Sequence, residues 1–422
     1  MSSIDLHRKN VFERMPEGSI MVVFAGAPKI ASGDEDLPFV INKNFFYLTD
    51  ISQENSILMF IKTLTDKKTY LFVDENDPVK EKWYGKKLTV EEAKNISGLN
   101  DVFLTKEFES ILSLTLTNVN NQYGFINKLY LDLSPEIKVK ENTPTSILAE
   151  ELKEKYPHIE IVDLMPLLTS LRVIKDSDEI ERLQEAIDIT NNGLNDLILH
   201  VEPGQKEFEV SDRFEFYGRS HGRKDLSFST IVASGKNACI LHYPVAIQNE
   251  KIGPEDLILC DLGFQSRGYH ADITRTYPVS GKFTPLQRKI YQAVLNCNKA
   301  AIEYAKPGIS LRDLQDFTVN FLRNECIKEK LMEENDDIRK YYYHSISHHL
   351  GLDTHDVGGR DTLLEPGQVI TIEPGLYFAN YGIGVRVEDD ILITNERPIV
   401  LSSGIKKEIE DIEKLFAAKE KM

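Results

Sequence analysis

Two aspartates with apolar neighbours lie eleven residues apart, on either side of a segment that favours a tight turn. Asp261 follows the apolar run Leu257 to Cys260, and Asp272 precedes Ile273. Strands that bury these neighbours would draw both carboxylates inward. A turn at Ser266-Arg267-Gly268, centred between its first two residues, would set Asp261 directly opposite Asp272, with Cβ atoms about 5 Å apart. Carboxylates at that distance repel each other or share a proton, so the pair predicts a bound cation.

A second acidic pair of the same form occurs further along the chain. Glu373 follows the apolar run Val369 to Ile372, and Glu388 lies within Gly384 to Ile391. A hairpin turning near Asn380-Tyr381-Gly382 would bring these two carboxylates opposite each other as well. The chain between the two acidic pairs holds four histidines, His344, His348, His349 and His355. We therefore expect carboxylates and imidazole to converge on one site.

The first part of the chain alternates segments with strand and helix patterns. Strand-like runs occupy Ser19 to Ala25, Ser56 to Lys62, Thr69 to Val73, Lys128 to Leu133 and His158 to Leu164. Helical patterns occupy Lys106 to Leu116 and Thr145 to Lys155. This alternation predicts an α/β domain that ends near Leu168.

A new helix start marks a second domain. Asp176 can cap a helix with Glu179 three residues later, and Pro203-Gly204 stops that helix. Further strands are expected at Thr230 to Ser234, Leu257 to Gly263, Val369 to Glu373 and Gly384 to Thr394. Further helices are expected at Pro285 to Ala305, Leu311 to Lys328 and within the charged closing stretch Lys406 to Met422. Long antiparallel strands with helices packed outside predict an α+β domain.

Composition argues against several classes of function. Lys and Arg total 50 against 67 Asp and Glu, a formal charge of −17 that repels nucleic-acid phosphates. No eighteen apolar residues run together and the sequence starts with polar residues, so we expect a cytoplasmic protein with no membrane partner. The four cysteines lack CxxC spacing, and we expect buried thiols.

The order and wording of the acidic and histidine motifs resemble a known family, the pita-bread metallopeptidases. The matching residues stand in the contexts CDLG, ADITRT, SHHLGLDTHDVG, TIEPG and GVRVEDD and are Asp261, Asp272, His348, Glu373 and Glu388. Any one of the four acids alone would be interpreted as a solvated surface carboxylate, but five candidate ligands in one order would not. The segment Ala238 to Pro244, with His344 and His355, is similar to the proline-specific branch, aminopeptidase P and prolidase.

The first part of the chain carries a resemblance of its own. The segments MPEGS, FAGAP, NFFYLT and WYG, which begin at Met15, Phe24, Asn44 and Trp83, resemble the aminopeptidase P N-terminal domain. The resemblance therefore implies an aminopeptidase P type α/β domain over residues 1–168 and an α+β pita-bread catalytic domain over residues 169–422.

The family resemblance implies two divalent metal ions. Asp261 would hold one ion, His348 and Glu373 the other, and Asp272 and Glu388 would bridge both. Four carboxylates and one imidazole form an oxygen-rich donor set that suits Mn²⁺, Co²⁺, Fe²⁺ or Mg²⁺ better than a thiolate-type zinc site, and manganese is the expected metal. Two such ions about 3.5 Å apart would share a hydroxide and polarise the scissile carbonyl, and Glu373 would accept the proton.

The resemblance also assigns residues to the substrate. His242 and His355 would donate hydrogen bonds to the tetrahedral intermediate and the peptide. His344 would lie near the proline ring. Arg386 would orient Glu388 by a charge-assisted hydrogen bond, and Tyr377 would shape the same pocket.

For two residues near these motifs, a purely structural role is an alternative to a functional one. His349 follows a proposed ligand on a strand-like segment, so it should point away and serve the structure. Trp83 is the only tryptophan. It is either a partly buried core aromatic or, as the resemblance suggests, a residue that reaches the substrate cleft of a neighbouring subunit.

The expected function is a metal-dependent exopeptidase that releases the N-terminal residue from peptides with proline in second position. A dedicated site is reasonable because proline lacks the amide hydrogen that general peptidases bind. One alternative is a prolidase that takes only Xaa-Pro dipeptides. Another is a non-catalytic binding protein on the same fold. The expected partners are proline-containing peptides and further copies of the chain, in a homo-dimer or homo-tetramer.

Overall fold

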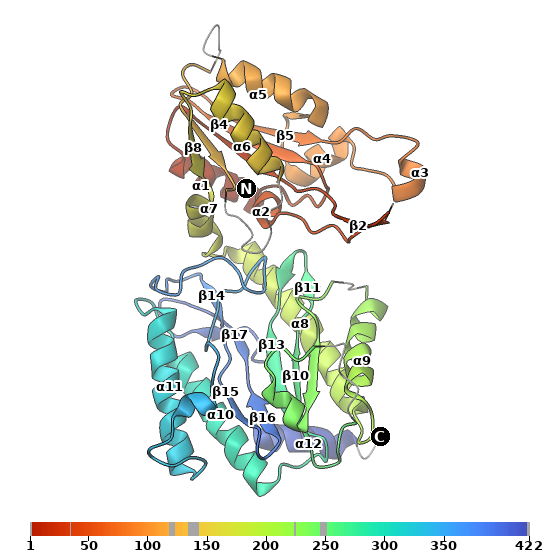
Figure 1. Ribbon diagram of the computed structural model, residues 1–422, viewed down its shortest axis with the longest axis vertical. Helices are drawn as coiled ribbons and strands as arrows, with labels where there is room; N and C mark the ends of the chain where they lie inside the picture. The colour runs from red at the N-terminus through yellow and green to blue at the C-terminus, as the bar shows by residue number, and fades with distance from the viewer. Residues whose placement is uncertain are drawn as a thin grey trace. The chain divides into compact units, whose positions relative to one another are not determined.

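The protein divides into two compact units, Met1–Arg172 and Val173–Met422 (Figure 1). The structure is a computed structural model that describes residues 2–33, 35–117, 123–133, 143–222, 225–244 and 251–419. The division falls at the end of helix α7 (Met165–Arg172), a few residues after Leu168. Across these described ranges, no helix combines the length and the apolar character that crossing a membrane requires.

The N-terminal unit is built on a six-stranded mixed sheet of order β6-β5-β4-β1-β7-β8. The strands are β1 (Ser19–Phe24), β4 (Ile57–Lys62), β5 (Lys67–Val73), β6 (Val102–Leu104), β7 (Lys128–Leu131) and β8 (Glu160–Asp163). All five expected strands are present, and β6 is an addition. The helices are α1 (Ser3–Arg14), α2 (Lys43–Thr49), α3 (Glu81–Tyr84), α4 (Val90–Ser97), α5 (Phe108–Leu116), α6 (Pro144–Lys155) and α7, beside a small hairpin of β2 (Ile30–Ser32) and β3 (Glu35–Asp36). The predicted α/β architecture is confirmed.

Helix α8 (Ser177–His200) opens the C-terminal unit with the expected cap. The Asp176 carboxylate accepts hydrogen bonds from the N–H groups of Asp178 and Glu179, and the Glu179 carboxylate accepts one from the N–H of Asp176. This reciprocal capping satisfies donors that the first turn leaves without helical partners.

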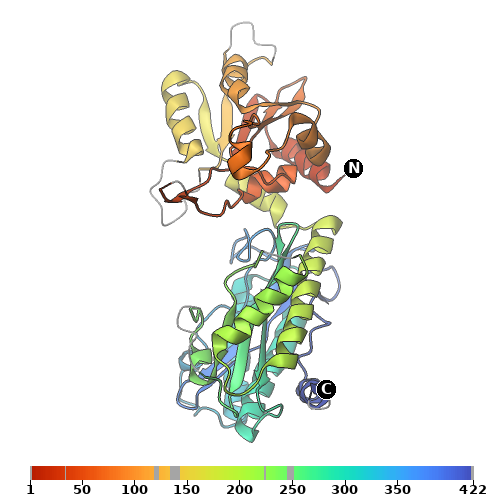
Figure 2. The same ribbon diagram turned by 90° about the vertical axis from the view of Figure 1, so that its right-hand side faces the viewer.

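Helices cover the strands of the C-terminal unit from two sides. The remaining helices are α9 (Glu207–Ser220), α10 (Pro285–Tyr304), α11 (Leu311–Lys328) and α12 (Ile409–Lys419). Figures 1 and 2 show α8 and α9 on one side of the strands and α10 and α11 on the other. The expected closing helix is present, and residues 420–422 of that prediction lie outside the described residues.

The first acidic motifs lie on a long hairpin. Strand β10 (Leu257–Leu262) pairs with β9 (Ile231–Ser234) and with β13 (Ile273–Pro278), and β11 (Gln265–Ser266) pairs with β12 (Tyr269–His270) nearer the turn. Asp261 lies opposite Thr274, so the prediction that it lies directly opposite Asp272 is wrong. The turn is centred one residue later, because Arg267 and Gly268 both take positive φ (47° and 82°), as a two-residue hairpin loop of the primed type requires.

The two aspartates nevertheless share one face of this hairpin. Asp272 lies two residues before Thr274, and side chains two apart on a strand point the same way. Gly263 lets the two arms of the hairpin approach closely here, since a Cβ atom at this position would lie 1.9 Å from the carbonyl oxygen of Ala271. The glycine of the CDLG motif therefore has a packing reason.

The second acidic motifs lie on an interrupted hairpin. Strand β14 (Val369–Ile372) pairs with β17 (Asp389–Leu392), which also pairs with β18 (Ile399–Val400), and β15 (Gly375–Phe378) pairs with β16 (Ile383–Arg386). Both pairings keep one register, in which Glu373 faces Glu388 across the interruption. The expected single strand Gly384 to Thr394 is thus split, because Pro374 has no N–H to donate to the ladder.

Candidate metal centre

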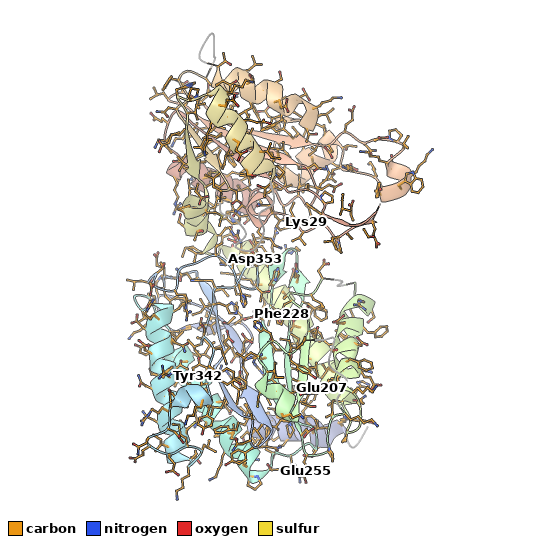
Figure 3. The ribbon with its side chains drawn as sticks, viewed as in Figure 1. Lys29, Glu207, Phe228, Glu255, Tyr342 and Asp353 are labelled. Atoms are coloured by element: carbon orange, nitrogen blue, oxygen red, sulfur yellow. The ribbon has the colours of Figure 1, made fainter. Side chains whose placement is uncertain are left out.

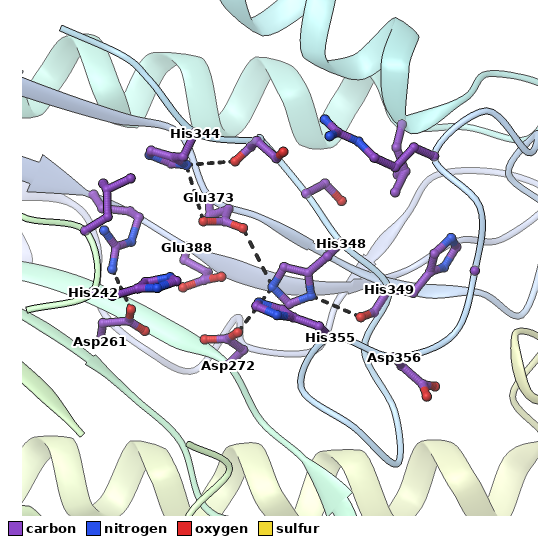
Figure 4. A pocket seen from close by; sticks show the side chains of 17 residues that line it. His242, Asp261, Asp272, His344, His348, His349, His355, Asp356, Glu373 and Glu388 are labelled. Atoms are coloured by element: carbon purple, nitrogen blue, oxygen red, sulfur yellow. Dashed lines mark hydrogen bonds and ion pairs between the residues drawn. The ribbon is translucent and has the colours of Figure 1, made fainter. Parts of the chain in front are cut away.

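One cavity in the C-terminal unit collects the residues that the motifs singled out. It has a volume of about 350 Å³ and is lined by all five proposed ligands and four of the proposed substrate-binding residues, namely Asp261, Asp272, His348, Glu373, Glu388, His242, His344, His355 and Arg386 (Figure 4). Tyr377 lies behind this wall, where its hydroxyl contacts His344 and Arg386.

Three of the five proposed ligands come within coordinating reach of one another. Asp272, His348 and Glu388 offer ligand atoms that all lie within 4.8 Å. The His348 Nε2 atom is 3.3 Å from Asp272 Oδ2 and 3.7 Å from Glu373 Oε1. The Nδ1 atom of the same ring contacts the His349 carbonyl oxygen at 3.0 Å. Donation of the Nδ1 proton to that carbonyl leaves Nε2 free to ligate an ion.

Asp261 lies at the other end of the acidic cluster. Its Oδ2 atom accepts a hydrogen bond from Arg386 at 2.5 Å. Its Oδ1 atom is buried and accepts no hydrogen bond from the described residues. A buried carboxylate oxygen without a donor is costly, and a cation supplies what it lacks. The donor set of the cavity therefore fits divalent metal ions.

Burial and mutual repulsion raise the pKa values of the carboxylates. Burial, with the neighbouring charge of Asp272, raises the pKa of Asp261 to about 6 even though Arg386 opposes the change. Burial likewise raises the pKa of Glu373 to about 7 and holds that of Glu388 well above its ordinary value, again with Asp272 adding to the repulsion. Without a cation the cluster holds protons instead, because like charges in a low dielectric cannot all ionise.

His348 shows the opposite response to the same acids. Burial by itself lowers the pKa of this imidazole, but the hydrogen bond and charge of Asp272, with the charge of Glu373, raise it to about 9. The protonated ring therefore takes the place of a cation in the metal-free site. Metal binding must displace that proton together with those on the acids.

Arg386 does not contact the carboxylate that we expected. Its guanidinium donates to Asp261 and, through Nε at 2.9 Å, to the Thr274 hydroxyl. The Thr274 hydroxyl in turn donates to Glu388 Oε2 at 2.6 Å. The prediction of a direct bond from Arg386 to Glu388 is wrong, because β13 brings the Thr274 side chain between the two residues.

A directional chain of hydrogen bonds fixes His344. Arg386 Nη1 donates to the Tyr377 hydroxyl at 3.0 Å, and that hydroxyl lies 2.8 Å from His344 Nε2. On the other side of the ring, Nδ1 lies 2.8 Å from the Ser345 carbonyl oxygen, which can only accept. Burial, with the nearby Arg386 charge, lowers the pKa of His344 to about 3, so the ring is neutral with its proton on Nδ1.

His355 and His242 complete the walls of the cavity. The rings of His355 and His348 meet edge to face with centroids 4.4 Å apart, and burial lowers the pKa of His355. His242 is exposed and follows a 3₁₀ turn (Gly235–Cys239). Gly384 lets this turn approach β16, since a Cβ atom there would lie 2.2 Å from the Ala238 carbonyl oxygen.

Comparison with known proteins identifies the family. Residues 181–395 match the model of metallopeptidase family M24, and residues 5–123 match the aminopeptidase P N-terminal domain. A Xaa-Pro aminopeptidase of Haemophilus influenzae is 35% identical over 430 residues, which cover 97% of this chain and 96% of that protein. The chain belongs to metallopeptidase family M24.

Solved structures agree with this assignment. A provisionally assigned aminopeptidase P of Bacillus anthracis has a TM-score of 0.94 and 40% identity, covering 99% of both chains. Aminopeptidase P of Escherichia coli, solved with the inhibitor Pro-Leu, has a TM-score of 0.89 and 30% identity over 100% of both chains. The α+β pita-bread fold preceded by an α/β domain is therefore confirmed.

The structure adds residues around the M24 site that the motifs did not reveal. Glu207 is buried at the start of α9 (Figure 3). Its carboxylate accepts hydrogen bonds from the N–H and hydroxyl of Ser234 and from the Asn237 amide. Asn237 also donates to the Tyr243 hydroxyl at 3.0 Å, next to His242. No local sequence pattern marks Glu207, because its partners lie 27 and 30 residues away.

Asp390 is a second residue that the motifs did not single out. It is fully buried, and its Oδ2 atom accepts a hydrogen bond from the backbone N–H of Asp272 at 3.2 Å. Burial and the Asp272 charge hold the pKa of Asp390 well above its ordinary value. The double acid that closes GVRVEDD was the available signal, since Asp390 stands two residues after Glu388.

His349 and Trp83, for which the sequence allowed a structural role, differ from the proposed ligands. His349 points away from His348 and Glu373, as expected, although it lies outside any strand and only bridges Ile370 (Figure 4). Trp83 in the N-terminal unit is 80% exposed, so the reading of a partly buried core aromatic is wrong. Cys260, Cys297 and Cys326 are buried free thiols, whereas Cys239 is half-buried.

Proposed function

We propose that this chain is a Xaa-Pro aminopeptidase, a metal-dependent exopeptidase that releases the N-terminal residue from peptides with proline second. The observation that carries the proposal is the cavity in which Asp272, His348 and Glu388 bring ligand atoms within 4.8 Å of one another. Full-length similarity to named Xaa-Pro aminopeptidases supports this substrate class and does not favour the prolidase alternative. A non-catalytic binder on this fold would not need to keep all five ligand positions.

Two divalent ions, for which manganese is the preferred metal, would occupy the acidic end of the cavity. Asp261, Asp272, His348, Glu373 and Glu388 would hold these ions. When bound, such ions act as Lewis acids and lower the pKa of water. Oxygen donors predominate over nitrogen in this set and no thiolate contributes, which favours Mn²⁺ over zinc.

The side chains around the ligands bind and orient the peptide. Glu373 accepts a proton at its carboxylate, and His242 and His355 donate hydrogen bonds to the peptide carbonyl as negative charge develops on its oxygen. His344 uses both ring nitrogens within the protein, so it offers the substrate an uncharged ring face suited to proline. Tyr377 and Arg386 hold that ring in place.

We further propose a homo-oligomer, dimer or tetramer, in the cytoplasm. Trp83 and Tyr84 on α3 are 80% and 73% exposed, and Val79 beside them is 65% exposed. Large apolar side chains gathered at one surface are typical of a protein interface. The free cysteines suit a reducing compartment, and the net charge of −17 disfavours nucleic acid as a partner.

A paired assay tests the proposed substrate class. Metal-free protein reconstituted with Mn²⁺ is given a Xaa-Pro-Xaa tripeptide, the matching Xaa-Pro dipeptide and a tripeptide with alanine second. We expect release of the first residue from the proline tripeptide, with at least about 100-fold lower kcat/KM for the alanine peptide, the scale on which a site built for one group rejects another. Cleavage of the dipeptide alone would establish a prolidase instead, and no cleavage with no bound metal would establish a binding protein.

A further inference from the structure

The two glutamate ligands sit at a gap in the backbone ladder. Between the pairs Ile372 with Asp389 and Gly375 with Arg386, the regular strand pairing is interrupted although the register is kept. The N–H of Glu373 donates to the Ile346 carbonyl and the N–H of Glu388 donates to the Thr274 carbonyl. Both donors thus leave the hairpin, and the backbone bond across the gap runs from the Val387 N–H to the Pro374 carbonyl at 3.3 Å.

Asn298 of α10, which is not part of the cavity lining, adds a side-chain connection at this gap. Its side chain is fully buried, and its Nδ2 atom donates to the carbonyl oxygens of Ile372 at 3.1 Å and Val387 at 3.3 Å. These two carbonyls belong to the residues immediately before Glu373 and Glu388. One amide group therefore ties both ligand-bearing strands together at the gap.

Lys407 determines the orientation of the Asn298 side-chain amide. Its ammonium donates to Asn298 Oδ1 at 2.8 Å and to Asp389 Oδ2 at 2.5 Å. An ammonium has donors and no acceptor, so it must face the amide oxygen. The amide nitrogen, with its two hydrogens, is thereby directed at the two carbonyls. The segment before α12 thus sets the orientation of a group that acts near the metal site.

We propose that Asn298, oriented by Lys407, is a positioning residue that sets the spacing of Glu373 and Glu388 for metal binding. The inference rests on the proposed metal site. Neither residue contacts the cavity, so their effect passes through the backbone. Groups behind the ligands that fix ligand geometry typically change metal affinity by about 10 to 100-fold when removed.

Cobalt binding to the metal-free full-length protein tests this inference, because the visible absorption of Co²⁺ reports both affinity and coordination. Asn298→Asp keeps the shape and the acceptor for Lys407 but loses both donors and sets an anion against two carbonyls. We expect its Co²⁺ affinity to fall about 10 to 100-fold, with an altered spectrum. In the peptide assay kcat should fall while KM changes little, since the substrate-binding side chains are untouched.

A set of lysine variants separates positioning from general weakening. Lys407→Met removes the donor and should weaken Co²⁺ binding about 10-fold, whereas Lys407→Gln restores a donor and should recover affinity to within about threefold of wild type. The matched control is Lys299→Met, which breaks an exposed pair between Lys299 and Glu408 at 2.7 Å, joining the same two segments. It should leave Co²⁺ affinity within about twofold of wild type, as exposed pairs contribute little.

The outcomes distinguish this inference from the proposed function. If Asn298→Asp binds Co²⁺ like wild type with an unchanged spectrum, the positioning role is overturned while the metal site stands. If Asn298→Asp does not fold, equal affinities for Lys407→Met and Lys407→Gln overturn it. A wild-type protein that binds no metal would overturn the proposed metal site itself, whatever the variants do.

Discussion

Glu388 and Asp389 are adjacent in the chain, and both are buried, yet their surroundings differ completely. Glu388 faces the cavity among other carboxylates, and burial with their repulsion holds its pKa well above the ordinary value. Asp389 points the other way, where Arg275 lies at 2.8 Å and Lys407 at 2.5 Å. Burial alone would raise the pKa of Asp389, but these two cations hold it well below its usual range.

The contrast distinguishes a site whose buried charges need a bound cation from a cluster whose charges are balanced by the protein itself. The network around Asp389 is neutralised by the protein's own cations and also accepts a hydrogen bond from Ser402 at 2.7 Å. The cavity cluster includes Arg386 as its fixed cation, and a buried Asp261 oxygen still lacks a donor among the described residues. Unbalanced buried charge is what marks a functional site.

Removing a ligand should produce the largest effect. Asp272→Ala takes away a carboxylate that contacts His348 at 3.3 Å and repels Asp261, Glu373 and Glu388. We expect kcat/KM to fall at least about 10³-fold, about 4 kcal/mol, through lost metal binding. The metal-free variant should be as stable as wild type or more so. Metal content and thermal unfolding of the variant check these expectations, and a substitution of an exposed acid, Asp188→Ala, is the control. Near-wild-type turnover of Asp272→Ala would refute the dinuclear assignment.

Removing the neighbouring acid from the balanced cluster should harm stability instead. Asp389→Ala leaves Arg275 buried and unpaired, which costs about 3 to 5 kcal/mol of unfolding free energy. The double variant Asp389→Leu with Arg275→Met removes the fully buried ion pair and leaves Lys407, which is partly exposed, so it should recover much of that loss. Urea unfolding of the metal-free proteins measures both. An Asp389→Ala protein of unchanged stability would show that the two clusters do not differ as described.

The pH dependence of stability should separate metal-free from metal-loaded protein. Folding raises the pKa of Asp261 to about 6, of Glu373 to about 7 and of His348 to about 9. Below about pH 6.5 the lowered pKa values of His344 and His355 oppose this effect. From about pH 6.5 to about 9 the folded metal-free protein holds protons on Glu373 and His348 that the unfolded chain has lost, so its stability falls as pH rises. Bound Mn²⁺ replaces those protons and removes the fall. The melting temperatures of the metal-free and the metal-loaded protein, measured across this pH range, test the prediction. Parallel curves for the two forms would contradict it.

The faces of the acidic residues could be predicted from the sequence better than their partners. Alternation placed Asp261 and Asp272 on one face, and a turn misplaced by one residue shifts the register by two and keeps that face. The error arose because Arg267, not a typical residue for positive φ, takes φ 47° in the turn. The second hairpin kept the expected register on both sides of Glu373.

Contacts between distant segments had no local signal. The partner of Arg386 depended on how β13 meets β16, and the bonds of Asn298 join residues 74, 89 and 109 positions apart. Motif spacing reports which residues share a strand or turn, and these pairs share neither. The motifs therefore identified the residues facing the cavity, whereas the groups behind them became visible only in the folded chain.

Two matched substitutions that each remove one hydroxyl group should have the smallest effects and compare the two clusters most directly. Thr274 donates to Glu388 at 2.6 Å and Ser402 donates to Asp389 at 2.7 Å. Ser402→Ala should lower the unfolding free energy by about 1.5 to 3 kcal/mol, as for a hydrogen bond to a charged group, without changing metal affinity. Thr274→Val should instead weaken metal binding about 10-fold, because Glu388 loses the donor that orients it, with little effect on metal-free stability. Equal effects of the two variants on both measurements would erase the distinction between the clusters.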